Sequence, residues 1–177
     1  MAIKSTLLTV ILGFLLTQTA IAEDVVQSFS GIPWGTTVEE IKGLQETARS
    51  GDIRYYKRSE DFYSIGGVTL SEVIYGFYQD AYFAAYMNLT SADALAKIKR
   101  HLDTVYGDPR TQLFLKKTIY IWDYENVKIK LKQYTGRSNA KLAFYYTPLS
   151  IQANASKPGA SGEKIYKLDT GEQEYDF

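Results

Sequence analysis

The strict alternation of apolar and basic residues over 126–132 constrains the fold of this chain more than any other feature. Its valine, isoleucine and leucine alternate with Lys128, Lys130 and Lys132. Successive side chains of a β-strand point to opposite faces, so this pattern predicts a strand with one apolar face and one basic face. A strand of this kind is typical of an antiparallel sheet with one solvated face.

Similar runs predict further strands, which pair as hairpins. Gln79 and Asp80 form the short turn of a first expected hairpin, and Glu125 lies in the turn of a second. Short polar connections between apolar runs are the basis of this prediction. The strands are expected at 53–58, 68–78, 82–89, 117–124, 126–134 and 141–147.

Helical spacing of apolar residues predicts two helices. The first is expected over 38–44, with Thr36 or Thr37 as its N-cap. The second is expected over 91–106, where Ser91 is the N-cap and a glycine followed by a proline ends the helix. These caps and stops are local signals, so they predict where each helix begins and ends.

The order of these elements is a helix and three strands, twice. We therefore expect an α+β fold in which two helix-plus-three-strand halves, about 29–89 and 90–147, form one antiparallel sheet with both helices on one face. The similar patterns of the two hairpins indicate an internal duplication of about 60 residues. The free sheet face is the expected binding surface.

The first 22 residues have the pattern of a secretory signal peptide. Lys4 precedes an apolar run over 7–16, and small residues precede an expected cleavage between Ala22 and Glu23. The apolar run is too short for a membrane-spanning helix, which needs about 20 residues. We therefore expect a periplasmic or secreted protein without a membrane span, with a single domain over 23–149 and a flexible tail over 150–177.

Composition excludes several classes of chemistry. The chain has no cysteine, which excludes disulfides, thiolate metal sites and a cysteine nucleophile. It has 20 basic and 20 acidic residues, so its bulk charge does not predict nucleic-acid binding. No motif identifies catalytic residues, a metal site or a cofactor.

The candidates for enzymatic chemistry are the single histidine and several carboxylates. His101 lies on the expected second helix, where Asp103 points to a different face. A glycosidase would need two carboxylates about 5–9.5 Å apart across a cleft. The candidate carboxylates are Glu60, Asp61, Asp80, Asp123 and Glu125. All of them are at expected turns or strand ends, where solvated acids are common.

The candidate binding residues lie on the second hairpin. The segment 116–141 has seven basic residues against two acids, a local net charge of +5. On the strand before the lysines, alternation puts three aromatic residues on one face. If the aromatic and basic residues share a face, they form a mixed surface suited to a protein or an anionic ligand. The candidates are Tyr120, Trp122, Tyr124, Lys128, Lys130 and Lys132. The alternatives are core packing for the aromatic residues and a solvated face for the lysines.

Two resemblances bear on this interpretation. The run from Gly31 to Thr36, Gly-Ile-Pro-Trp-Gly-Thr, resembles the start of small exported Gram-negative proteins whose function is mostly unassigned. The repeated helix-plus-hairpin plan is similar to modules of the β-lactamase-inhibitor-protein type, and the segment 35–41 resembles the turn that opens each repeat. Those modules contain cysteines and this chain has none, so the resemblance does not carry their inhibitory function to it.

These observations favour a non-enzymatic periplasmic binding or accessory module. The expected partner is a protein or an anionic component of the cell envelope. The alternatives are an envelope hydrolase with carboxylate chemistry and a structural subunit of an envelope assembly. The sequence does not determine the oligomeric state.

Overall fold

The computed structural model describes residues 25–59 and 62–156. The expected signal peptide over 1–22 lies outside the described residues, as does the expected tail from residue 157 onward. No helix in the described ranges is long and apolar enough to cross a membrane.

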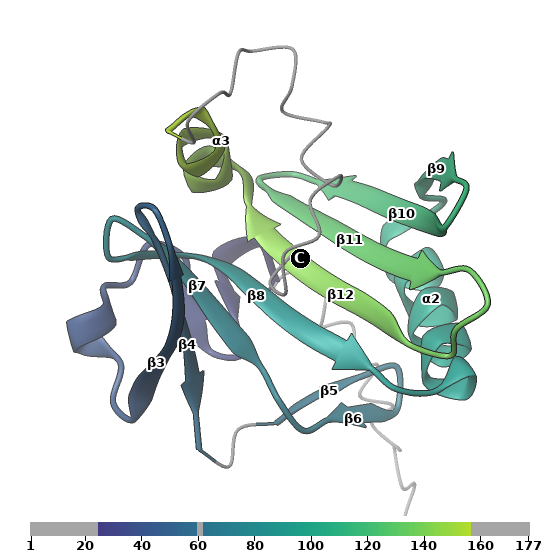
Figure 1. Cartoon of the computed structure of the whole chain (residues 1–177), viewed down its shortest axis with the longest axis horizontal. Helices are drawn as coiled ribbons and strands as arrows, with labels where there is room; N and C mark the ends of the chain where they lie inside the picture. The colour runs from purple at the N-terminus through teal and green to yellow at the C-terminus, as the bar shows by residue number, and fades with distance from the viewer. Residues whose placement is uncertain (1–24, 60–61, 157–177) are drawn as a thin grey trace, which may run out of the picture.

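An eight-stranded antiparallel sheet dominates the fold (Figure 1). Four strands from the first half of the chain lie side by side, then four from the second half in reverse order. Across the sheet they are β3 (Leu44–Ser50), β4 (Ile53–Arg58), β7 (Ile74–Tyr78), β8 (Ala81–Leu89), β12 (Ala140–Tyr146), β11 (Val127–Tyr134), β10 (Lys117–Tyr124) and β9 (Arg110–Phe114). The centre of the sheet is therefore the pairing of β8 with β12.

Two short hairpins lie outside this sheet. They are β1 (Ser28–Phe29) with β2 (Ile32–Pro33), and β5 (Tyr63–Ile65) with β6 (Val68–Leu70). In the loop after β2, the indole Nε1 of Trp34 donates a hydrogen bond to the Val25 carbonyl oxygen at 2.9 Å. Its ring stacks on Tyr82, with the ring centroids 4.8 Å apart. Trp34 therefore packs between the N-terminal segment and the start of β8 and holds the two together.

One helix packs on each face of the sheet, and both contact β8. The helix α2 (Ala92–Tyr106) begins where the Ser91 hydroxyl accepts a hydrogen bond from the Ala94 amide at 3.1 Å. Its buried side chains pack into the core on one face. The helix α3 (Thr147–Ala155) contacts β8 and β12 and packs into the core of the other face. The expected tail boundary at residue 150 therefore lies inside a helix.

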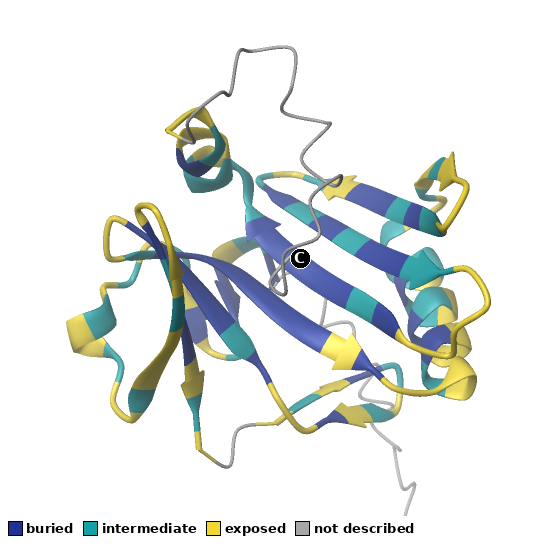
Figure 2. Cartoon of the chain, viewed as in Figure 1, coloured by how far each residue is buried: buried dark blue, intermediate teal, exposed yellow. Residues whose placement is uncertain are grey.

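The sheet is buried on both faces near its centre (Figure 2). On β8, Ala85 and Met87 belong to the core under α2, whereas Ala84 and Tyr86 belong to the core on the opposite face. All four side chains are at most 3% exposed. A strand that is buried on both sides reads as a continuous apolar run rather than as an alternation.

The expected fold of two helix-plus-three-strand halves is wrong. The structure is mostly β, with 51% of its described residues in strands and 23% in helices. The expected first helix is only the 3₁₀ turn η1 (Val38–Glu40), in which the Glu40 carboxylate accepts a hydrogen bond from the Thr37 amide at 2.8 Å. Gly43 then has φ +80°, outside helical geometry, and β3 begins at the next residue.

Several local predictions are confirmed. The helix at 91–106 is present with its expected cap, and β10 pairs with β11 in the expected hairpin. Gln79 and Asp80 join β7 to β8 with φ values of +47° and +68°. Positive φ at both central residues is typical of the two-residue hairpin turns that match strand twist.

We predict that Gly66→Ala destabilises the protein by about 1–3 kcal/mol more than Gly67→Ala does. Both glycines have positive φ in the β5–β6 turn, so alanine is strained at either position. A Cβ at Gly66 would also lie 2.8 Å from His101 Cβ on α2, whereas a Cβ at Gly67 meets nothing within 4 Å.

Urea unfolding of the two variants measures this difference. Gly67→Ala is the matched control, because it reports backbone strain alone. Equal losses of unfolding free energy in the two variants would show that the β5–β6 turn does not pack tightly on α2.

Candidate functional site

The register of β10 with β11 decides which face carries the basic row. Lys128, Lys130 and Lys132 lie opposite Asp123, Ile121 and Ile119, so these six side chains share one face. Lys141 on β12 joins them, because it is the cross-strand partner of Lys132. This face is opposite α2. We call it the lysine face, defined by Lys128, Lys130, Lys132 and Lys141.

The expected aromatic residues lie on the other face, under α2. Trp122 is 2% exposed, and its Nε1 donates a hydrogen bond to the Gly107 carbonyl oxygen at 2.9 Å. The Lys99 ammonium of α2 lies 4.8 Å from the Tyr120 ring centroid. The Tyr124 ring contacts the Tyr106 ring at 5.1 Å between centroids. Tyr120, Trp122 and Tyr124 therefore attach α2 to the sheet and do not share a surface with the lysines.

Three other tyrosines lie on the lysine face instead. The rings of Tyr86 and Tyr145 meet edge to face with centroids 5.6 Å apart, and Tyr55 lies 5.9 Å from Tyr86. The Lys130 ammonium lies 5.4 Å from the Tyr145 ring centroid. These three tyrosines come from β4, β8 and β12. Sequence reasoning missed them because only the register of distant strands brings them together.

A glycine makes room for the central ring of this cluster. A Cβ at Gly76 on β7 would lie 3.0 Å from Tyr86 Cε2, so any side chain there would displace the ring. Burial, with a smaller contribution from Tyr145 and Tyr55, raises the pKa of Tyr86 well above its ordinary value. Burial alone raises the pKa of Tyr55. Burial therefore favours the neutral form of Tyr55 and Tyr86.

The ammonium groups of the lysine face are partly buried and close together. Lys132 is 4% exposed, and the side chain of Lys128 is 25% exposed. Lys128 Nζ lies 3.5 Å from an Asp123 carboxylate oxygen. Lys132 and Lys141 are direct cross-strand partners.

The enzymatic candidates do not converge in the described residues. His101 lies against the β5–β6 turn, and burial lowers its pKa. Asp123 accepts a hydrogen bond from Arg110 at 3.2 Å, and Asp80 is ion-paired with Arg54. Glu125 has φ +49° in the β10–β11 turn. The expected pair Glu60 and Asp61 lies outside the described residues.

A metal site is also absent from what the structure describes. Within 25–59 and 62–156, no group of three histidine or acidic side chains is arranged to hold a metal ion. The expectation that the chain uses no metal is a prediction from its composition and is not tested by this geometry.

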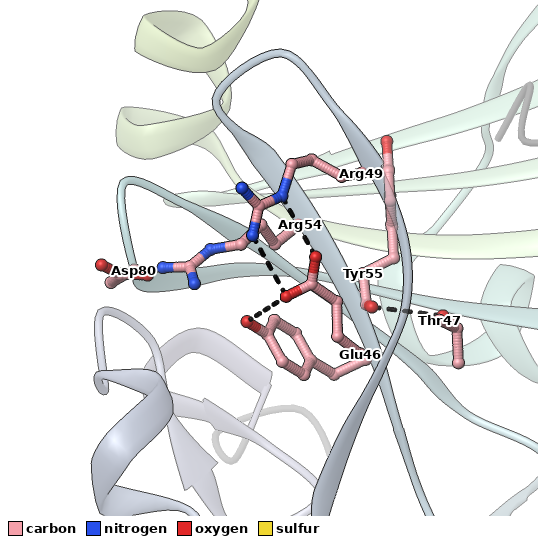
Figure 3. Close-up of polar contacts among 7 residues, drawn as sticks. Glu46, Thr47, Arg49, Arg54, Tyr55 and Asp80 are labelled. Carbon is pink, nitrogen blue, oxygen red and sulfur yellow. Dashed lines mark hydrogen bonds and ion pairs between the residues drawn. The ribbon is translucent and has the colours of Figure 1, made fainter.

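A second polar cluster lies at the β3 edge of the sheet (Figure 3). The Glu46 carboxylate accepts hydrogen bonds from Arg49 Nε at 3.1 Å and from the Tyr56 hydroxyl at 3.3 Å. The Arg49 guanidinium lowers the pKa of Glu46. The register shifts between Glu46 and Ala48, and the Thr47 hydroxyl donates to the Tyr55 carbonyl oxygen at 3.2 Å. This cluster therefore holds a β-bulge at an edge strand, which is a structural role.

Comparison with known proteins leaves the chain without an assigned relative. No family model, curated protein or solved structure matches it. The resemblances to small exported Gram-negative proteins and to the β-lactamase-inhibitor-protein type therefore stay predictions.

We predict that the free energy of unfolding falls as pH rises above about 10, and that Tyr86→Phe makes this fall shallower. Because the pKa of Tyr86 is raised, its hydroxyl stays protonated in the folded chain at pH values at which it loses its proton in the unfolded chain. The stabilisation is complete below the unfolded pKa and is lost as pH rises toward the folded one. Urea unfolding at a series of pH values from neutral to alkaline measures the slope.

Tyr124→Phe on the α2 face is the control for loss of a tyrosine hydroxyl. Equal slopes for wild type and Tyr86→Phe would contradict the burial of a neutral Tyr86 in this cluster.

Proposed function

We propose that the protein is a non-enzymatic binding module that holds an anionic partner on its lysine face. The observation that carries this proposal is the arrangement of four lysines on two adjacent strands, with Lys132 directly opposite Lys141. The exported location expected from residues 1–22 makes a protein or an anionic envelope component the partner.

The spacing of the lysines favours an extended acidic segment of a protein. Side chains at every second position of a strand lie about 6.6–6.8 Å apart. Lys128 and Lys130 therefore match carboxylates at every second position of an extended peptide laid along β11. Lys132 and the three tyrosines are buried in this face and offer little surface to a partner.

The carboxylate hydrolase is supported less well. Its best-placed acid, Asp123, is already engaged by Arg110 and Lys128. The described residues bring no second carboxylate to it across a cleft. A structural subunit remains the third interpretation, and self-association of the purified chain distinguishes it from a binding module.

We predict that the triple variant Lys128→Gln, Lys130→Gln and Lys141→Gln binds an acidic peptide about tenfold more weakly than wild type, or worse. Lys132 is left in place because it is 4% exposed and its replacement would disturb the fold. The probe is a fluorescent peptide of alternating glutamate and threonine, and fluorescence anisotropy measures its affinity. The protein is the chain without residues 1–22, which retains every described element.

Two controls make this test specific. The variant Lys42→Gln, Lys97→Gln and Arg100→Gln removes three cations elsewhere and should bind as wild type does. A peptide with glutamine in place of glutamate should bind weakly to all variants. Equal peptide affinity of the wild type and the lysine-face variant, with both folded by circular dichroism, would refute the proposal.

A further inference from the structure

The β9–β10 hairpin ends in a group of exposed apolar residues. Leu113 is 79% exposed, Phe114 is 48% exposed and Leu115 is 92% exposed. We call these three residues the apolar tip. In the described ranges the only other exposed large apolar residues are Phe62 and Ile151, at 66% and 54%. Consecutive exposure of this kind marks an interaction site more often than isolated exposed residues do.

The apolar tip presents side chains on both faces of the hairpin. Leu113 lies opposite Thr118, on the side of the sheet that α2 covers. Phe114 lies opposite Lys117, on the side of the lysine face, and Leu115 is in the turn itself. Figure 2 shows that the exposed residues extend around the end of β9. A rigid protein surface would contact one side of such a tip, whereas a fluid acyl layer surrounds it.

Cations adjoin the apolar tip, with Lys116 beside Leu115 in the turn and Lys117 at the start of β10. Lys116 and Lys117 follow it in the chain, and the Thr135 amide donates a hydrogen bond to the Lys116 carbonyl oxygen at 2.9 Å. This contact brings the β11–β12 loop, with exposed Arg137, to the same end of the sheet (Figure 1).

The acids of the segment 116–141 are at its other end. Asp123 and Glu125 lie at the β10–β11 turn, where Asp123 faces Lys128 in the register. One end of the hairpin is therefore apolar and cationic, and the opposite end carries the acids. Apolar side chains in front of a cationic collar complement an anionic lipid surface, because phosphate groups lie outside the acyl chains.

We propose that the apolar tip inserts into the surface of a bilayer that contains anionic lipid, with Lys116, Lys117 and Arg137 at the headgroups. This site is separate from the lysine face and adds peripheral membrane attachment to the proposed binding function. The tip is too small to cross the bilayer. Attachment is reversible and depends on both the apolar residues and the cations.

Vesicle flotation tests the insertion. The chain without residues 1–22 is mixed with phosphatidylcholine vesicles prepared with or without phosphatidylglycerol. Wild type should float with the anionic vesicles, and Leu113→Gln with Leu115→Gln should reduce the vesicle partition coefficient at least about tenfold. Phe62→Gln with Ile151→Gln is the matched control, because it removes the same number of exposed apolar side chains elsewhere, and it should float as wild type does.

Two further variants separate the roles of charge and insertion. Lys116→Gln with Arg137→Gln should remove most of the preference for phosphatidylglycerol, and added salt should do the same for wild type. Leu115→Trp places a fluorophore in the turn, and its emission should shift to shorter wavelength on anionic vesicles. Flotation of Leu115→Trp with anionic vesicles without this shift would indicate contact by charge alone and would overturn insertion.

Several outcomes overturn the proposal outright. These are no flotation of wild type with anionic vesicles, equal flotation of wild type and the Leu113→Gln, Leu115→Gln variant, and equal loss in the Phe62→Gln, Ile151→Gln control. Self-association of wild type that the Leu113→Gln, Leu115→Gln variant abolishes, without vesicle binding, would make the tip an interface between copies. None of these results changes the peptide affinity of the lysine face, so the two proposals fail independently.

Discussion

The antiparallel pairing of β8 with β12 is the contact on which the remaining structure depends. It joins four strands of the first half of the chain to four of the second half, across more than 50 residues of sequence. Its register sets Tyr86 opposite Ala143, which brings Tyr145 and Lys130 to the same face of the sheet. A shift of one residue would move every side chain of these strands to the opposite face. The composition of both faces is therefore a consequence of this one register.

Burial on both faces distinguishes the centre of the sheet from its outer strands. The helix α2 holds one face through Trp122 and its apolar stripe, and α3 packs against β8 and β12 on the other. The outer strands β3 and β9 have only one neighbour each among the described strands. At β3 a bulge held by Glu46 and Arg49 interrupts the regular edge, which discourages pairing with another chain. At β9 the exposed residues gather in the apolar tip instead.

Sequence signals predicted correctly those elements whose formation depends mainly on neighbouring residues. The caps of α2, the β10–β11 hairpin and the alternation of the lysines are properties of neighbouring residues, and each is present. The helix expected at 38–44 failed because its apolar spacing competes with Gly43 and with the pairing of β3 to β4, which only tertiary structure reveals. For the candidate site, alternation predicted the row of lysines but not its aromatic neighbours. The strand alternation also puts Tyr120, Trp122 and Tyr124 on one face. It does not show that this face is the one covered by α2, because the position of the helix depends on tertiary packing.

The lysine face lies on β11 and β12 and the apolar tip at the β9–β10 turn, and all four strands are neighbours in one sheet, so the register fixes the mutual orientation of the two surfaces. The tip projects along the direction of β9 and β10, whereas the lysines stand across the plane of the sheet. A molecule held by its tip at a bilayer would therefore present the sheet edge-on to the lipid and turn the lysine face sideways, parallel to the membrane normal. In that orientation a peptide bound along β11, as proposed above, would run parallel to the membrane normal, and the β10–β11 turn would lie at the end away from the lipid. Attraction of Lys116, Lys117 and Arg137 by the anionic lipid would favour this orientation, because at the opposite end of the hairpin Asp123 is paired with Arg110 and Lys128.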